Sequence, residues 1–255
     1  ESDESSITFN DIDTYVVSVV MTDKNGCTTD ASDEVTAEIT EKPVATVTPS
    51  ALSVCFGESI TFTATPVDAV EYIWNVNGVT STTTENTLTV SEDKKYEVFV
   101  NVTSNDGCVY DNSATVTAEI YSKPTVSLTS SGSTCFGNTL TFTAEPASDE
   151  NTYAWTVNGN PYTESDESSI TLNDADTYVV SVVMTDKNKC LTDVSNEVTA
   201  EIYAKPSVSL TSSGNVCFGK TLTFTAEPAS DENTYTWTVN GNPYTESDES
   251  SITFN

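Results

Sequence analysis

The sequence repeats itself with a period of roughly 80 residues, which constrains the fold more than any other feature. Its three tryptophans, Trp74, Trp155 and Trp237, are evenly spaced along the chain. The segment Glu1–Asn10 recurs letter for letter at Glu246–Asn255. Lys-Pro pairs recur with nearly the same spacing, at Lys42, Lys123 and Lys205. So do Cys-Phe-Gly triplets, which begin at Cys55, Cys135 and Cys217. A period of this size is typical of an array of small domains, each built on one plan.

The Lys-Pro pairs divide the chain into two complete repeats and two halves. We predict complete repeats at 42–122 and 123–204, a C-terminal half-repeat at 1–41 and an N-terminal half-repeat at 205–255. Neither half alone contains the strands that a closed core needs. We therefore expect the chain to be an internal stretch of a longer array.

Each repeat has the pattern of an all-β domain. In the repeat 123–204, short segments rich in Val, Thr, Ile, Phe and Tyr alternate apolar with polar residues between turn-forming residues, as strands do. No window has helical periodicity. The expected strands cover 125–128, 140–144, 153–157, 169–172, 178–184 and 197–202.

Two features narrow this to an immunoglobulin-like antiparallel β-sandwich. Trp155 follows Phe142 at the spacing of a core tryptophan in the third strand. Tyr178 comes just before Val180 and resembles a tyrosine corner, with valine where antibody domains have a cysteine. The residues expected to build the cores by the same reasoning are Trp74, Trp155, Trp237, Tyr15, Tyr96 and Tyr178.

The charge of the chain excludes several functions. It has 39 acidic residues and nine basic ones, all lysines, for a net charge of −30, and it has no histidine. Such a polyanion repels nucleic acids and anionic membrane surfaces. Without histidine the commonest general base is missing. The sequence also lacks a run of about 20 apolar residues, the length that a membrane-spanning helix needs. We predict that the chain is not an enzyme, binds no nucleic acid and does not insert into a membrane.

The repeated motifs are recognisable as a set. They are Cys-Phe-Gly, Thr-Leu-Thr-Phe-Thr-Ala, Tyr-x-Trp, Asp-x-Tyr-x-Val-x-Val and Thr-Asp-Lys-Asn-Gly-Cys at 22–27. Over the whole chain they resemble the Ig-like or PKD-like repeats of giant secreted adhesins of the Bacteroidota, including the mobile adhesins of gliding bacteria. The resemblance implies secretion and display on the cell surface, and it identifies no ligand.

The six cysteines fit two pairing schemes. One joins cysteines within a repeat, Cys55 to Cys108 and Cys135 to Cys190; the other staggers the bond, joining Cys55 to Cys190. Cys55 precedes the middle of the second strand by seven residues, about 20 Å along an extended strand. Cys108 follows the fifth expected strand of its repeat and lies near the opposite end, whereas a disulfide needs Cα atoms within about 7 Å. We favour the staggered bond, and the within-repeat bonds and six free thiols remain alternatives.

Acidic loops offer a candidate metal site. Asp149, Glu150, Asp174 and Asp176 belong to acidic clusters that recur, and clustered carboxylates are the ligands that calcium prefers. The same residues serve equally as solvated loops that keep a long polymer soluble. No window matches a known calcium loop, so we favour solvation and predict no cofactor.

Three functions fit these features. The first is a structural stalk that holds an adhesive region away from the cell. The second is an array of modules that each bind a surface polysaccharide or protein, and the third is a binding module of an exported enzyme. Residues 141–153 and 223–235 are almost identical, yet the repeat 42–122 has different loops at 67–70 and 79–82. A shared ligand site would recur in those loops, so the sequence favours the stalk. No Gly/Ser-rich spacer separates the repeats, which predicts an elongated rod whose partners are its neighbouring repeats.

Overall fold

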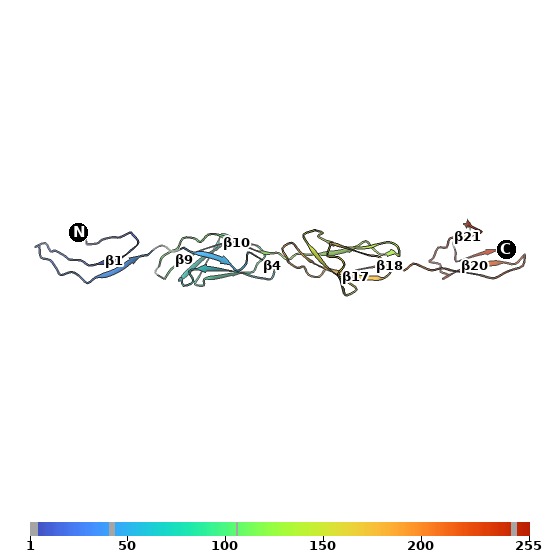
Figure 1. Cartoon of the computed structure of the whole chain (residues 1–255), viewed down its shortest axis with the longest axis horizontal. Helices are drawn as coiled ribbons and strands as arrows, with labels where there is room; N and C mark the ends of the chain where they lie inside the picture. Colours follow the sequence, from blue (N-terminus) through green and yellow to red (C-terminus); the bar gives the residue numbers. More distant parts are fainter. Residues whose placement is uncertain (1–4, 41–43, 106, 246–248) are drawn as a thin grey trace. The chain divides into compact units, whose positions relative to one another are not determined.

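The structure is a computed structural model that describes residues 5–40, 44–105, 107–245 and 249–255. In these residues it is all-β, built from strands, turns and loops (Figure 1). The chain divides into two compact units, one of Glu1–Thr125 with Thr185–Thr192 and one of Val126–Met184 with Asp193–Asn255. Lys42 and Pro43, the predicted start of the first complete repeat, lie outside the described residues.

Unit 1 contains a complete sandwich of two sheets. The three-stranded sheet has the order β3 (Thr46–Pro49), β5 (Ile60–Thr65), β8 (Thr87–Val90). The five-stranded sheet has the order β4 (Ser53–Cys55), β10 (Val116–Tyr121), β9 (Lys95–Thr103), β6 (Glu71–Val76), β7 (Val79–Thr83). All pairs are antiparallel except β4 with β10, which is parallel. This is the immunoglobulin-like order A-B-E facing A′-G-F-C-C′.

Unit 2 contains a second sandwich with the same strand order. Its three-stranded sheet is β11 (Ser127–Ser130), β13 (Leu140–Glu145), β16 (Ser169–Leu172). Its five-stranded sheet is β12 (Thr134–Cys135), β18 (Val198–Tyr203), β17 (Thr177–Thr185), β14 (Thr152–Val157), β15 (Asn160–Tyr162). The all-β prediction of tandem immunoglobulin-like sandwiches is confirmed. The short strands β12 and β15 and their counterparts β4 and β7 were not predicted.

Period-2 alternation along the strands builds one core in each sandwich. In the first, Phe62, Trp74 and Val98 are fully buried and pack in one cluster that extends from Ala45 to Ile120. In the second, Phe142 and Trp155 occupy the same places in a cluster from Leu128 to Ile202. Each cluster falls inside one of the predicted complete repeats.

The end segments form smaller sheets. In unit 1, β1 (Asp13–Val17) pairs with β2 (Val35–Ile39). In unit 2, β19 (Ser209–Ser212), β20 (Leu222–Glu227) and β23 (Ser251–Phe254) form one sheet, and β21 (Trp237–Val239) pairs with β22 (Asn242–Tyr244). The β1–β2 pair corresponds to strands F and G of a complete repeat, and the C-terminal segment corresponds to strands A, B, C, C′ and E.

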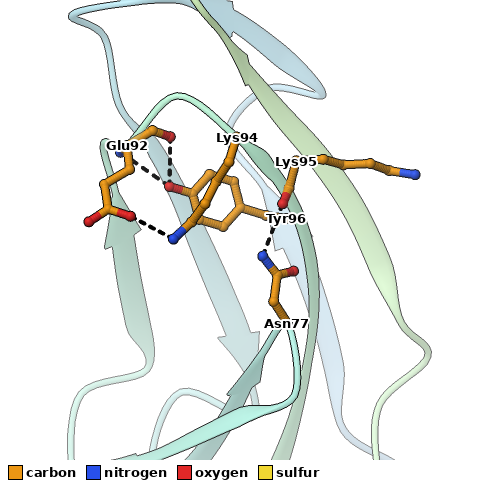
Figure 2. Close-up of polar contacts among 5 residues, drawn as sticks. All are labelled: Asn77, Glu92, Lys94, Lys95 and Tyr96. Atoms are coloured by element: carbon orange, nitrogen blue, oxygen red, sulfur yellow. Dashed lines mark hydrogen bonds and ion pairs between the residues drawn. The ribbon is translucent and has the colours of Figure 1, made fainter.

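The tyrosine corner is present in all three places where the sequence has it. The Tyr96 hydroxyl donates a hydrogen bond to the Glu92 carbonyl oxygen at 2.8 Å and accepts one from the Glu92 N–H at 3.1 Å (Figure 2). Tyr178 and Tyr15 donate in the same way to the carbonyl oxygens of Asp174 and Asp11. Burial, and then the nearby carboxylates of Asp174 and Asp176, raise the pKa of Tyr178 above its ordinary value. The corner fixes the start of strand F.

An asparagine at the C–C′ turn also holds strand F. Asn77 adopts a positive φ of 51°, which asparagine tolerates in tight hairpin turns. Its side chain accepts from the Glu97 N–H at 2.7 Å and donates to the Lys95 carbonyl oxygen at 3.0 Å; the latter bond is drawn in Figure 2. Asn158 makes the equivalent bonds to Val179 and Thr177. In both complete sandwiches, strand F is therefore held by the tyrosine corner and by the asparagine of the C–C′ turn.

Candidate functional site

The loop that follows strand F presents a cysteine on a short hairpin in each of its three copies. The three hairpins are closed by the antiparallel bridges Thr22↔Thr28, Thr103↔Val109 and Thr185↔Leu191. In each, the cysteine carbonyl oxygen accepts a backbone N–H from four residues earlier: from Asp23 to Cys27 at 2.8 Å, from Ser104 to Cys108 at 2.9 Å and from Asp186 to Cys190 at 3.0 Å. The loop thus has one backbone structure in all three copies.

A side chain at the start of the hairpin holds the cysteine backbone. The Asp186 Oδ1 accepts the N–H groups of Asn188 at 2.9 Å and Cys190 at 2.8 Å. Asp23 accepts the equivalent N–H groups, and in the remaining loop the Ser104 hydroxyl accepts the Cys108 N–H at 3.1 Å. The bond from the Cys27 N–H, followed by those from Asn25, lowers the pKa of Asp23 below its ordinary value.

The Cys-Phe-Gly triplet forms a tight turn at the other end of each repeat. The carbonyl oxygens of Cys55, Cys135 and Cys217 each accept the N–H of the residue three positions on, at 3.2, 3.1 and 3.1 Å. The glycines Gly57, Gly137 and Gly219 have φ values of 87°, 96° and 84°, which residues with a Cβ rarely adopt. The intervening side chains of Phe56, Phe136 and Phe218 are exposed.

Cys55 and Cys190 form a disulfide, so the structure has the staggered pairing. Their Cα atoms are 5.5 Å apart, although 135 residues separate them in the sequence. The hairpin Thr185–Thr192 that carries Cys190 belongs to unit 1, whereas β18 and all of β17 except its last residue belong to unit 2. The Cys190 side chain is buried, with 1% exposed.

The within-repeat pairings, Cys55 with Cys108 and Cys135 with Cys190, are wrong. Cys55 pairs with Tyr121 at the end of β10. Cys108 follows the end of β9, which runs antiparallel to β10, so it lies at the opposite end of the sandwich. The cysteines with free thiols are Cys27, Cys108, Cys135 and Cys217.

The four calcium candidates do not share a site. Asp149 and Glu150 follow the end of β13, while Asp174 and Asp176 follow the end of β16. The two strands are antiparallel, so these pairs lie at opposite ends of the sandwich. The Asp176 carboxylate accepts the Thr177 N–H at 2.8 Å and so caps the turn before strand F. Within the described residues no three His, Cys, Asp or Glu side chains gather closely enough to hold a metal ion.

A recurring serine was missed by the sequence reasoning. The Ser113 hydroxyl accepts the Val100 N–H at 3.1 Å and donates to the Ala114 carbonyl oxygen at 3.1 Å. Ser195 and Ser32 make the equivalent pair of bonds. These bonds hold the chain after the cysteine hairpin against strand F. The signal was available, because the three serines are spaced at the repeat period.

Comparison with known proteins finds partial similarities to solved structures at low sequence identity. No protein-family model and no curated protein matches the sequence. Similar solved structures include the fibronectin(III)-like modules of Clostridium thermocellum CbhA, with 16% identity over 62% of this chain and 94% of that one and a TM-score of 0.35. Murine CEACAM1b has 14% identity over 62% of this chain and 99% of that one, with a TM-score of 0.34. The FN1–FN3 domains of chicken CNTN1 have 14% identity over 74% of this chain and 77% of that one, with a TM-score of 0.33. The immunoglobulin-like fold itself follows from the strand order described above.

The described part of the chain also contains no helix long and apolar enough to cross a membrane.

Proposed function

We propose that this chain is a structural stalk segment of a long bacterial cell-surface adhesin, which holds an adhesive region away from the cell. The observation that carries the proposal is the disulfide between Cys55 and Cys190, which lie in successive repeats of the sequence. Such a bond joins neighbouring repeats a second time, beside the main chain. A second covalent link between neighbouring repeats strengthens the array under tension and restricts bending between the repeats.

The position of the bond supports a load-bearing role. Tension applied along the chain passes from Cys55 through the disulfide to Cys190, so the residues between them carry little of it. The 134 residues between the two cysteines, one fewer than their sequence separation of 135, include most of two hydrophobic cores. Fully extended, they would add roughly 450 Å to the length of the chain. The disulfide therefore limits how far the stalk can lengthen under load.

Two further features support an extracellular stalk. Disulfides persist in oxidising compartments and are rare in the cytosol, which supports secretion. The net charge of −30 keeps a long array of β-sandwiches soluble and opposes edge-to-edge pairing of its strands.

Single-molecule stretching of the 255-residue chain tests the proposal. With the disulfide intact, we expect unfolding to release no length from the residues between Cys55 and Cys190. After substitution of both by serine, we expect unfolding to release roughly 450 Å more. The matched control substitutes Cys27 and Cys217, whose thiols are free, and should stretch like the unaltered chain. Equal extension of the two variants would refute a load-bearing bond.

A second candidate function is an array of adhesive modules, and one observation favours it. An exposed phenylalanine occupies the same turn in each Cys-Phe-Gly triplet, at Phe56, Phe136 and Phe218. Aromatic side chains presented at a regular interval could bind a polysaccharide or protein with avidity. Replacing all three with alanine would abolish retention on immobilised cell-surface polysaccharide under this function and leave it unchanged under the stalk function.

A further inference from the structure

The edge strand β7 of the first complete sandwich is long, uncharged and open. It is the last strand of its sheet and, among the described residues, pairs with β6 alone. It has five residues, Val79–Thr83, of which the first four are exposed. Natural sheets usually protect such an edge with a very short strand, a proline or a charge, because its free backbone groups can pair with another strand. None of these protections is present in β7.

The equivalent edge strand of the second sandwich, β15, has all three protections. It has three residues, Asn160–Tyr162, with a proline in the middle. In the register of the hairpin, Pro161 occupies the place that Thr80 has in β7. The acidic segment 164–167 follows directly afterwards. The two complete sandwiches share one strand order, so they differ at this edge by its protection and not by its topology.

The backbone groups on the open side of β7 belong to Thr80 and Thr82. The Asn77 N–H donates to the Glu97 carbonyl oxygen of β9 at 3.0 Å. Backbone groups alternate in direction along a strand, so every second residue of β6 before Asn77 likewise faces β9. Those residues are the partners of Thr80 and Thr82. The N–H and C=O groups of these two threonines therefore point away from β6, toward the open side of the sheet.

These groups are complementary to a second copy of the same strand. Antiparallel pairing of two copies about Ser81 places Thr80 of one chain opposite Thr82 of the other. Residues opposed in this way exchange both of their main-chain hydrogen bonds, and opposed threonine side chains add to the stability of the pair. Such a threonine pair already joins two antiparallel strands of this sandwich, since the hydroxyl oxygens of Thr61 and Thr89 are 2.9 Å apart.

The charges beside β7 also favour the antiparallel arrangement. The register about Ser81 places Glu85 of one chain level with Asn77 of the other, whereas parallel pairing would bring two copies of Glu85 together. The net charge of −30 on each chain opposes their approach. Salt screens that repulsion over about 8 Å at physiological ionic strength, but it does not weaken main-chain hydrogen bonds in the same way. Pairing should therefore strengthen as salt is added.

We propose that β7 is a lateral docking edge, which pairs antiparallel with β7 of a second copy of this chain and so joins the five-stranded sheets of two sandwiches. This goes beyond the stalk function, because a single stalk can carry load without a lateral partner. A two-fold axis at Ser81 relates the two copies, so each uses the same strand and the contact closes at a pair. The strand is short, so the pairing is weak and reversible.

The test uses the whole 255-residue chain with its free thiols alkylated, so that no disulfide can link two copies. Sedimentation at rising protein and salt concentration should show a reversible dimer. The Thr80 and Thr82 amides should exchange about tenfold more slowly once most chains are paired, because their protection follows the paired fraction. The Ser81 amide already faces β6 and should not change. A monomer at every concentration would overturn the proposal. So would a dimer that leaves both threonine amides unprotected, or protection that requires a basic peptide of alternating lysine and valine.

Two variants at one position separate the main chain from the side chain. Thr80→Pro removes the outward N–H and should weaken dimerisation by about tenfold or more, because each copy loses a hydrogen bond. Its sandwich should stay folded, since Pro161 occupies the same place in the second sandwich, and thermal unfolding checks this. The matched control Thr80→Ala keeps the N–H and should weaken dimerisation by no more than about fivefold. Equal weakening by the two variants would refute main-chain pairing at β7.

Discussion

The second complete sandwich and the C-terminal segment have almost the same sequence and very different burial. Residues 141–153 and 223–235 are nearly identical. The strand pairing is also identical, since Leu128 pairs with Ala144 as Leu210 pairs with Ala226. Yet Leu128 is 3% exposed and Leu210 is 61% exposed.

The comparison shows that strand pairing depends on nearby residues, whereas burial depends on distant ones. Strand pairing within the A-B-E sheet depends on residues close in the sequence, and it forms in both places. Burial of that sheet depends on strands F and G, which β17 and β18 supply in the complete repeat. The apolar side chains of a β-sandwich are thus placed by their own strands and buried by strands much further along the chain.

The largest expected difference between the two regions is the effect of removing the core tryptophan. Trp155→Ala should lower the free energy of unfolding of its sandwich by about 3–5 kcal/mol, because it leaves a cavity in a closed core. Trp237→Ala should cost much less, since among the described residues its cluster has Ala226 and Ile252 as its only other buried members. Both indoles donate the same 2.9 Å hydrogen bond to a backbone carbonyl oxygen, so that term cancels.

Urea denaturation followed by amide exchange of β13 and β20 measures the two effects separately. Equal losses at the two positions would mean that the C-terminal segment has a closed core of its own. Burial in that segment would then not depend on strands F and G.

A smaller difference is expected at the recurring serine. Ser113→Ala leaves the Val100 N–H without its partner in a buried place, which should cost about 1–3 kcal/mol. Ser32→Ala removes the same bond to Val19, but there water can replace the hydroxyl because the site is exposed. Thermal unfolding and exchange of the Val100 and Val19 amides provide the measurement. A large effect at Ser32 would show that water does not replace the hydroxyl there.

The long strands with alternating apolar residues were predicted well from the sequence. The long strands β13, β14 and β17 begin within one residue of the predicted positions, because alternating apolar residues reveal them. The strands β4 and β12 have three and two residues, too few for an alternating pattern. Their existence depends on parallel pairing with β10 and β18, which no local signal encodes.

The candidate site was predicted in part for the same reason. The staggered disulfide could be argued from strand direction alone, since Cys55 and Cys108 lie at opposite ends of one sandwich. The hydrogen bonds that the Asp186 and Ser195 side chains accept in this loop could not be predicted from the sequence, because a serine or aspartate in a loop is compatible with many partners. Both residues recur at the repeat period, but the sequence reasoning did not single them out, and their spacing alone does not reveal what they bind.

The smallest expected effect concerns the cysteine hairpin with a free thiol. The Cys27 and Asn25 N–H groups stabilise the ionised form of Asp23, so its pKa is lowered on folding. Its stabilising contribution is therefore present above the unfolded-state pKa and is lost as the pH falls through the lowered folded value. Amide exchange of Cys27, measured by NMR at decreasing pH, should show this hairpin opening at acidic pH, and Asp23→Asn should open it at neutral pH. In the hairpin of Cys190 the disulfide adds a second restraint, so Asp186→Asn should disturb it less. If the two asparagine variants open their hairpins equally, the disulfide contributes nothing to the order of the loop, and the aspartate alone shapes it.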